Sequence, residues 1–105
     1  MKSLIKNKVE IGTELKLNLN IDPVGAFTMD SYDWEAEVFC CGEALHNDKS
    51  EAIRFDDSNY MLLIDTNKTG AGTLKCKVTA RIPDSDFPDM YRTEVNTINT
   101  GVEIV

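Results

Sequence analysis

The chain is dominated by segments in which apolar and polar residues alternate. Between residues 15 and 21 an apolar side chain fills every second position, and lysine or asparagine fills the positions between them. A period of two is typical of a strand with one buried and one solvated face. Asp22 and Pro23 end this segment, and residues 24–31 are predicted to be a connection with Gly25 in a turn.

A second alternating segment places its aromatic residues on one face. Acidic residues at positions 33, 35 and 37 alternate with this face, which fits a strand and does not fit the side of a helix. The predicted core face consists of Tyr32, Trp34, Ala36, Val38 and Cys40. Trp34 is therefore predicted to be a core anchor, and the alternative is that its wet edge stacks on a sugar ring.

The middle of the chain alternates between turns and short apolar segments. Residues 42–50 are predicted to form a polar turn, although a single helical turn near residues 47–52 is possible. A short apolar segment around residues 52–55 follows, and residues 60–65 are predicted to form a strand. Its consecutive apolar residues, Met61–Ile64, suit a strand that is covered on both faces or lies at a subunit contact. Residues 67–72, with Gly70 and Gly72, are predicted to form a turn.

The last third of the chain predicts a long hairpin. Residues 73–82 alternate regularly, the loop Pro83–Asp89 follows, and residues 91–105 are rich in β-branched side chains. Gly101 predicts a bulge in this final run. The inward residues of the first strand are predicted to be Leu74, Cys76, Val78, Ala80 and Ile82.

This spacing predicts an all-β protein. About six or seven strands at such intervals favour an antiparallel two-sheet sandwich of immunoglobulin-like character, formed by residues 13–105 as a single domain. Residues 1–12 are expected to be an N-terminal arm or an edge strand, since Leu4, Ile5, Val9 and Ile11 form only a weak pattern. No confident helix is predicted.

Charge narrows the possible partners. Eleven Lys and Arg residues against 18 Asp and Glu residues give a formal net charge of -7. Such a field repels a phosphate backbone, so nucleic acid is not expected as a partner, and anionic membrane surfaces are disfavoured in the same way. No apolar run reaches the length of a membrane helix.

Three cysteines, Cys40, Cys41 and Cys76, cannot all pair within one chain. Neighbouring residues on a strand point to opposite faces, so at most one of the first two could face Cys76. The first residues contain no apolar stretch of signal-peptide length. We therefore expect free thiols in a chain that is made and kept in the cytosol, without secretion by a signal peptide.

The acidic loop is the one constellation with the spacing of metal ligands. Asp84, Asp86 and Asp89 alternate with other residues as calcium ligands do, and calcium-stabilised folding is therefore one possibility. Pro83 and Pro88 bracket the loop, which favours a rigid polar connection instead. The glycine and the distal glutamate of the helix-loop-helix calcium motif are absent from it.

No other residues predict chemistry. The single histidine, His46, has neither a second histidine nor a nearby cysteine pair with which to bind a metal, so it is predicted to be a solvated loop side chain. Cys40 and Cys41 have only His46 as a potential base, and no serine lies in an elbow motif. We expect no catalytic, cofactor-binding or metal-binding residues, and we do not expect an enzyme.

Three segments resemble a group of small phage and prophage structural proteins from gut bacteria. They are Asp33–Phe39, the stretch from Gly70–Leu74 into Ile82–Glu94, and Thr100–Val105. More distantly, the same segments are similar to the immunoglobulin-like N-terminal domain of phage baseplate upper proteins. The matched segments cover roughly half of the chain, and the loop from Ile82 to Asp89 is their most distinctive part.

The resemblance implies a virion component that belongs to a tail, a baseplate or a head. Such a component would act through contacts with other virion proteins or with copies of itself, as a homo-oligomer. The alternative is a module that binds a carbohydrate or another ligand through exposed aromatic residues. The aromatic residues considered are Tyr32, Trp34, Tyr60, Phe87 and Tyr91, of which the first two lie on the predicted core face.

Overall fold

The structure is a computed structural model that describes residues 8–105, and it is mostly β. Within these residues eight strands form two sheets, and one short helix lies between the sixth and seventh strands. The strands are β1 (Lys8–Val9), β2 (Glu14–Asn20), β3 (Asp33–Phe39), β4 (Leu45–Asp48), β5 (Ile53–Asp56), β6 (Asn59–Asp65), β7 (Gly72–Pro83) and β8 (Tyr91–Ile104), and the helix is α1 (Thr66–Thr69). The prediction of an all-β protein with two sheets is confirmed apart from this helix.

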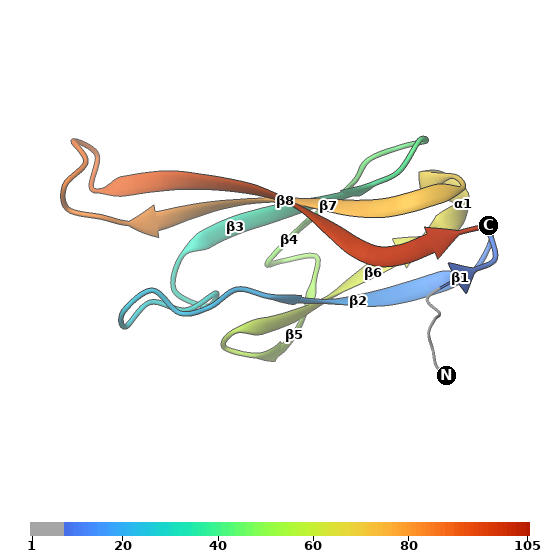
Figure 1. Ribbon diagram of the computed structural model, residues 1–105. Helices are drawn as coiled ribbons and strands as arrows, with labels where there is room; N and C mark the ends of the chain where they lie inside the picture. The colour runs from blue at the N-terminus through green and yellow to red at the C-terminus, as the bar shows by residue number, and fades with distance from the viewer. Residues whose placement is uncertain (1–7) are drawn as a thin grey trace.

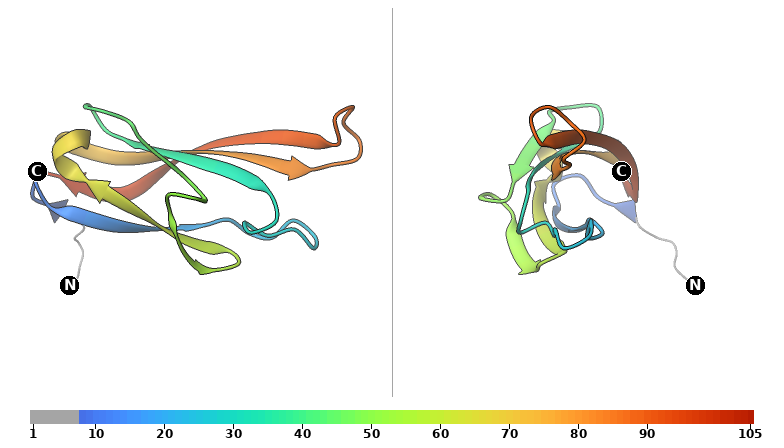
Figure 2. Two further views of the ribbon diagram at one scale, coloured as in Figure 1. Left: turned by 180° about the vertical axis from the view of Figure 1, so that it is seen from behind. Right: turned by 90° about the vertical axis from the view of Figure 1, so that its left-hand side faces the viewer.

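The larger sheet has the strand order β1-β8-β7-β3-β4, and the smaller one has the order β2-β6-β5. Seen along the long axis of the molecule, the larger sheet curls around the core as a half-barrel (Figure 2). β1 runs parallel to β8, so the prediction of a purely antiparallel arrangement is wrong for this pair. Only a few residues connect β1 in the larger sheet to β2 in the smaller sheet. β1 is the edge strand of the larger sheet.

The strand count is higher than predicted because two short strands carry weak sequence signals. β1 lies within residues 1–12, where an N-terminal arm or an edge strand was expected, and Leu4 and Ile5 lie outside the described residues. β4 lies where a polar turn was predicted, and it also replaces the start of the possible helical turn at residues 47–52. Polar side chains form a strand here because β3 supplies a partner over Glu35–Val38, and the pairing leaves Asn47 buried.

Between the sheets lies a core whose inward residues largely match the prediction. All five predicted residues of β7 are buried, and so are four of the five predicted on and beside β3, while Cys40 is half-buried. The apolar residues 61–64 were predicted to be covered on both faces of their strand or to lie at a subunit contact, and within the chain only one face is buried. Leu62 and Ile64 are buried at 1% and 2% exposure, whereas Leu63 is 50% exposed. β6 is therefore an ordinary strand with one wet face, paired with β2 and β5.

α1 occupies the position of the predicted turn, and the segment after β3 covers its C-terminal end. Asp65 caps the helix by accepting a hydrogen bond from the Asn67 N–H at 3.0 Å. At the other end, the Gly42 N–H donates to the Thr69 carbonyl at 2.8 Å, and the Glu43 N–H donates to the Lys68 carbonyl at 2.8 Å. Helix carbonyls that lack intrahelical partners are thus satisfied by a segment more than twenty residues earlier in the chain.

β7 and β8 form the predicted long hairpin, and its turn reaches one end of the molecule, opposite the end that holds β1 and the C-terminus (Figure 1). The predicted bulge is confirmed, because the register shifts between Thr73 and Lys75, opposite the stretch of β8 that contains Gly101. Gly101 has φ 79°, a conformation that suits glycine. The Thr100 hydroxyl donates to the Leu74 carbonyl at 2.7 Å and anchors the bulge to β7.

Candidate interaction surface

In the part of the chain that the structure describes, the first two thirds of β8 form an open sheet edge. On one side, β8 pairs with β7 from Tyr91 to Asn99 in unbroken register. On its other side, among residues 8–105, only Glu103 and Ile104 pair, with β1. Within residues 8–105, the stretch Tyr91–Asn99 therefore has no strand beside it on that side. An unpaired edge of this length is a template for another strand.

The hydrogen bond that closes the hairpin shows which backbone groups face this edge. The Asp84 N–H donates to the Met90 carbonyl at 2.9 Å, so the next pair, Pro83 and Tyr91, is of the type that exchanges no hydrogen bonds. This assignment agrees with the missing N–H of proline. Because the two types of pair alternate, every second residue of β8 directs its N–H and C=O away from β7. These residues are Tyr91, Thr93, Val95, Thr97 and Asn99.

Side chains on both faces of this stretch are accessible. Every residue from Thr93 to Asn99 is exposed, including Val95 at 54% and Ile98 at 45%. Neither a proline nor a lysine interrupts the stretch, although both commonly protect edge strands. Its two charged residues, Arg92 and Glu94, form an ion pair at 3.0 Å. The edge is thus locally neutral in a strongly acidic protein.

The acidic loop at the hairpin tip is organised by two arginines. Asp84 pairs with Arg92 at 2.8 Å, and Asp89 pairs with Arg81 at 2.8 Å. The Asp86 N–H and the Arg92 guanidinium lower the pKa of Asp84, and the Tyr91 N–H together with Arg81 lowers the pKa of Asp89. Two of the three carboxylates considered for calcium are therefore engaged with arginines, which favours the interpretation of the loop as a braced connection.

The five aromatic residues considered for ligand binding do not form one platform. Tyr32, Trp34 and Tyr60 are buried, and the rings of the last two meet edge to face at 5.0 Å. Phe87 and Tyr91 are 44% and 41% exposed at the hairpin tip. The Arg81 guanidinium lies over the Tyr91 ring at 4.9 Å from its centre, so one face of this ring is already occupied.

Two shallow hollows flank the hairpin. One of about 470 Å³ lies over β3 and β7 and is lined by residues that include Trp34, Arg81 and Thr93. A smaller one of about 220 Å³ lies between β2 and β8, where Leu17, Cys76 and Ile98 line it. The second hollow marks the place where the two sheets separate beside the open edge of β8.

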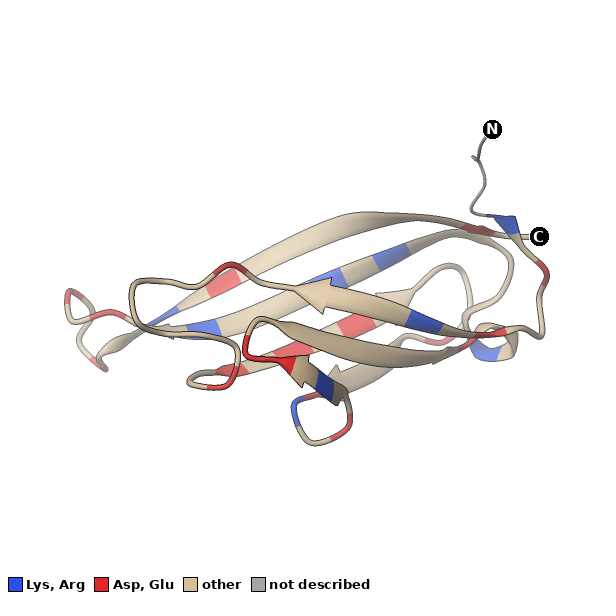
Figure 3. Cartoon of the chain, turned by 90° about the horizontal axis from the view of Figure 1, so that it is seen from below, with Lys and Arg blue, Asp and Glu red and all other residues tan. Residues whose placement is uncertain are grey.

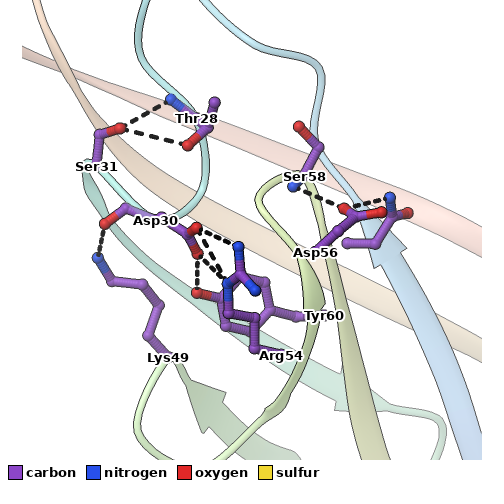
Figure 4. Close-up of polar contacts among 9 residues, drawn as sticks. Thr28, Asp30, Ser31, Lys49, Arg54, Asp56, Ser58 and Tyr60 are labelled. Carbon is purple, nitrogen blue, oxygen red and sulfur yellow. Dashed lines mark hydrogen bonds and ion pairs between the residues drawn. The ribbon is translucent and has the colours of Figure 1, made fainter.

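A polar network that the sequence did not predict ties the connection after β2 to the smaller sheet. The single Nε–H of Arg54 is shared between both carboxylate oxygens of Asp30 at 3.1 Å, and the Arg54 Nη2 donates to Asp30 at 2.9 Å. Asp30 also accepts a hydrogen bond from the Tyr60 hydroxyl (Figure 4). These interactions lower the pKa of Asp30, and burial together with Asp30 raises the pKa of Tyr60 to about 12. Because the partners are 24 and 30 residues away in the chain, no sequence spacing indicated them.

The histidine lies on β4 and not in a loop, so that part of its prediction is wrong. The His46 Nε2 lies 3.2 Å from Glu35, and its Nδ1 lies 3.2 Å from Glu51. His46, Asp48 and Glu51 form a group whose potential metal-ligand atoms lie within 4.8 Å of one another. Since carboxylates engage both ring nitrogens, this arrangement suits a protonated imidazole held in an ion-pair network.

The ion pairs of His46 with Glu35 and Glu51 should make a pH-dependent contribution to the stability of the protein. The hydrogen bond with Glu35, followed by that with Glu51, raises the pKa of His46. The contribution is therefore complete below the unfolded value of about 6.5 and is lost as the pH rises through the higher folded value. We expect His46→Gln to destabilise the protein slightly in acid and to have no effect in alkali, measured by urea unfolding at about pH 5.5 and about pH 8.5. An equal effect of the substitution at both pH values would contradict this prediction.

The thiols of Cys40 and Cys76 are poorly suited to nucleophilic chemistry. Cys76 points into the core as predicted, and burial raises its pKa to about 11. Burial and the neighbouring Cys41 raise the pKa of Cys40. Cys41 is exposed, and its Sγ lies 3.1 Å from the Ala71 carbonyl. A protonated thiol is a weak nucleophile, which agrees with a packing role for Cys40 and Cys76.

Acidic residues are spread along the molecule with lysines and arginines between them (Figure 3). Among the described residues, no helix has the length and apolarity needed to cross a membrane. Comparisons of the chain with models of known families, with curated proteins and with solved structures gave no match. The function therefore has to be inferred from the residues of this chain and their geometry.

Proposed function

We propose that the protein is a non-enzymatic assembly module that acts through protein–protein contacts. The observation that carries this proposal is the open edge of β8. Every second residue from Tyr91 to Asn99, five in all, directs its backbone N–H and C=O away from β7. Addition of a strand to an exposed edge is a common mode of protein recognition. The exposed apolar side chains of Val95 and Ile98 add contact area on both faces of such a strand.

The proposed context is a phage or prophage virion, in its tail, baseplate or head. The resemblance of Asp33–Phe39, the hairpin and Thr100–Val105 to small phage structural proteins supports this context. An immunoglobulin-like character of the two sheets belongs to the same proposal. The protein would be made in the bacterial cytoplasm and would bind other virion proteins or copies of itself, and neither nucleic acid nor a membrane is proposed as a partner. The net charge of -7 supports the last point.

Two measurements test this function together. The mass of the protein in solution should exceed that of one chain, or the chain should be found in purified virions from a lysogen that carries its gene. The second measurement uses mass spectrometry of particles that have been separated from free protein. A strict monomer that is absent from particles would contradict the proposal.

Ligand binding at the hairpin tip is the second candidate. Phe87 and Tyr91 are exposed, and a third hollow, lined by residues that include Phe27 and Met90, lies beside Tyr91. A binding module for carbohydrates would use these aromatic faces for stacking. Saturable binding on a glycan array that is lost in Phe87→Ala and Tyr91→Ala would support this candidate, and an array without binding would count against it.

A further inference from the structure

We propose that the partner of β8 is β8 of a second copy, paired antiparallel about a two-fold axis at Val95. This inference rests on the proposed assembly function and specifies the partner, the strand and the register. The paired stretch is Tyr91–Asn99, and the two larger sheets become one continuous sheet across the axis. A two-fold interface uses the same surface on both copies, so the stretch has to be complementary to itself.

The backbone meets this requirement. In the proposed register Val95 faces Val95 of the second copy, and Thr93 faces Thr97. All of these residues direct both N–H and C=O away from β7, as the alternation along the hairpin requires. Two such residues placed opposite each other form a pair that exchanges both hydrogen bonds. The ladder of β7 and β8 thus continues into the second copy. At its end the Tyr91 N–H, which donates to Asp89 at 3.3 Å in the single chain, exchanges this partner for Asn99 of the second copy.

The side chains meet the requirement as well, because residues 93–97 read Thr-Glu-Val-Asn-Thr and are nearly palindromic. Glu94 faces Asn96, so a carboxylate acceptor lies opposite an amide donor and no two like charges lie directly opposite each other. Only the Oε1 of Glu94 is engaged by Arg92, which leaves its Oε2 available. Arg92 faces Ile98, and its aliphatic stem can cover that exposed side chain.

Neighbouring registers fit less well. A two-fold axis at Thr93 places Asn96 opposite Met90, which lies in the hairpin turn with φ 70° and not in a strand. An axis at Thr97 places Thr93 opposite Gly101, inside the bulge. Axes at Glu94 and Asn96 also match outward groups with outward groups, but each pairs only seven residues, and the first places Glu94 opposite Glu94 of the second copy. The axis at Val95 pairs nine residues, Tyr91–Asn99, without entering the turn or the bulge.

The chain offers a substitution that blocks this edge and leaves the monomer intact. The Val95 N–H points away from β7, so Val95→Pro removes no hydrogen bond of the hairpin, and proline is tolerated on edge strands at such positions. In the dimer it removes both central hydrogen bonds. We expect the dissociation constant of the dimer to rise at least about tenfold, measured by analytical ultracentrifugation over a concentration series. Val95→Thr keeps the N–H and the β-branched shape, and it should still dimerise.

A charge exchange at the same position tests the register. Because residue 95 faces its own copy, Val95→Lys and Val95→Glu should each weaken the dimer through like-charge contact. A mixture of the two variants should form a one-to-one heterodimer, which native mass spectrometry distinguishes from either homodimer. Circular dichroism of each variant and of Val95→Pro verifies that the fold is retained.

The outcomes separate this inference from the proposed function. A dimer that survives Val95→Pro, or that shows no preference for the Lys–Glu mixture, would overturn the β8 pairing while self-assembly stands. A monomer at millimolar concentration that still enters virions would also overturn it, because the edge would then belong to a different virion protein. Protection of the Val95 amide from hydrogen exchange in a dilute monomer would overturn it too, since the chain itself would cover the edge.

Discussion

Leu62→Ala should lower the free energy of unfolding by about 2–5 kcal/mol, whereas Leu63→Ala should change it by less than about 0.5 kcal/mol. The two residues are neighbours on β6 and carry the same side chain. Leu62 is 1% exposed and belongs to the core between the sheets, while Leu63 is 50% exposed on the other face. Truncation of the first removes buried contacts and leaves a cavity, and truncation of the second removes contacts that water largely replaces.

Urea unfolding of both variants, followed by circular dichroism, measures this difference. It also tests the interpretation of the continuous apolar run at Met61–Ile64 as a strand covered on both faces. A large loss in Leu63→Ala, at protein concentrations where the wild type is oligomeric, would indicate that the wet face of β6 is a subunit contact. Equal and small effects of both substitutions would contradict the packing described here.

Gly42→Ala should destabilise the protein by at least about 2 kcal/mol. A Cβ atom at this position would lie 2.5 Å from the Lys68 carbonyl oxygen and 3.0 Å from the Thr69 carbonyl oxygen. These are backbone atoms at the end of α1, so they cannot move aside as a flexible side chain can. The methyl group has to separate the two segments, and the hydrogen bonds from the Gly42 and Glu43 N–H groups to the helix carbonyls weaken with it.

Gly25→Ala is the matched control. Gly25 has φ 60°, and a Cβ there would meet no atom within 4 Å. Only the conformational cost of a left-handed residue remains, about 1–2 kcal/mol. Thermal and urea unfolding should therefore give a lower free energy of unfolding for Gly42→Ala than for Gly25→Ala. The opposite order would mean that the segment after β3 does not pack against α1 in this way.

The proposed dimer and these two predictions concern different parts of the molecule. Gly42 and Leu62 act on the stability of one chain, whereas Val95 acts on the contact between copies. Val95 is 54% exposed at the edge of the larger sheet, and its substitution should leave the unfolding of the monomer nearly unchanged. Stability and assembly can therefore be measured as separate properties of the same protein.

Much of the candidate surface was predictable from local patterns. The alternation in Thr73–Ile82, the proline-bracketed loop and Gly101 indicated the hairpin, its turn and its bulge, because each depends on residues close in sequence. This alternation placed Leu74 inside, and the alternation around residues 32–40 placed Trp34 inside. What the pattern did not indicate was the open edge, since a strand is an edge or a centre only according to which strands lie beside it.

Other features depended on partners that are distant in the chain. Asp30 engages Arg54 and Tyr60, and no periodicity connects residues so far apart. β4 is polar and short, and it became a strand only because β3 offered backbone groups beside it. His46 was expected in a solvated loop, and the same pairing placed it between two carboxylates.

The sequence by itself determined that this protein is built of strands, where most of them begin and end, and which side chains point into the core. These properties follow from the two-residue period of a strand, in which each side chain's face is set by its position. The tertiary structure alone decided the strand order, the parallel pairing of β1 with β8 and the exposure of Tyr91–Asn99 at an open edge. Backbone hydrogen bonds between strands do not depend on side-chain identity, so the choice of neighbour is made by the packing of the whole chain.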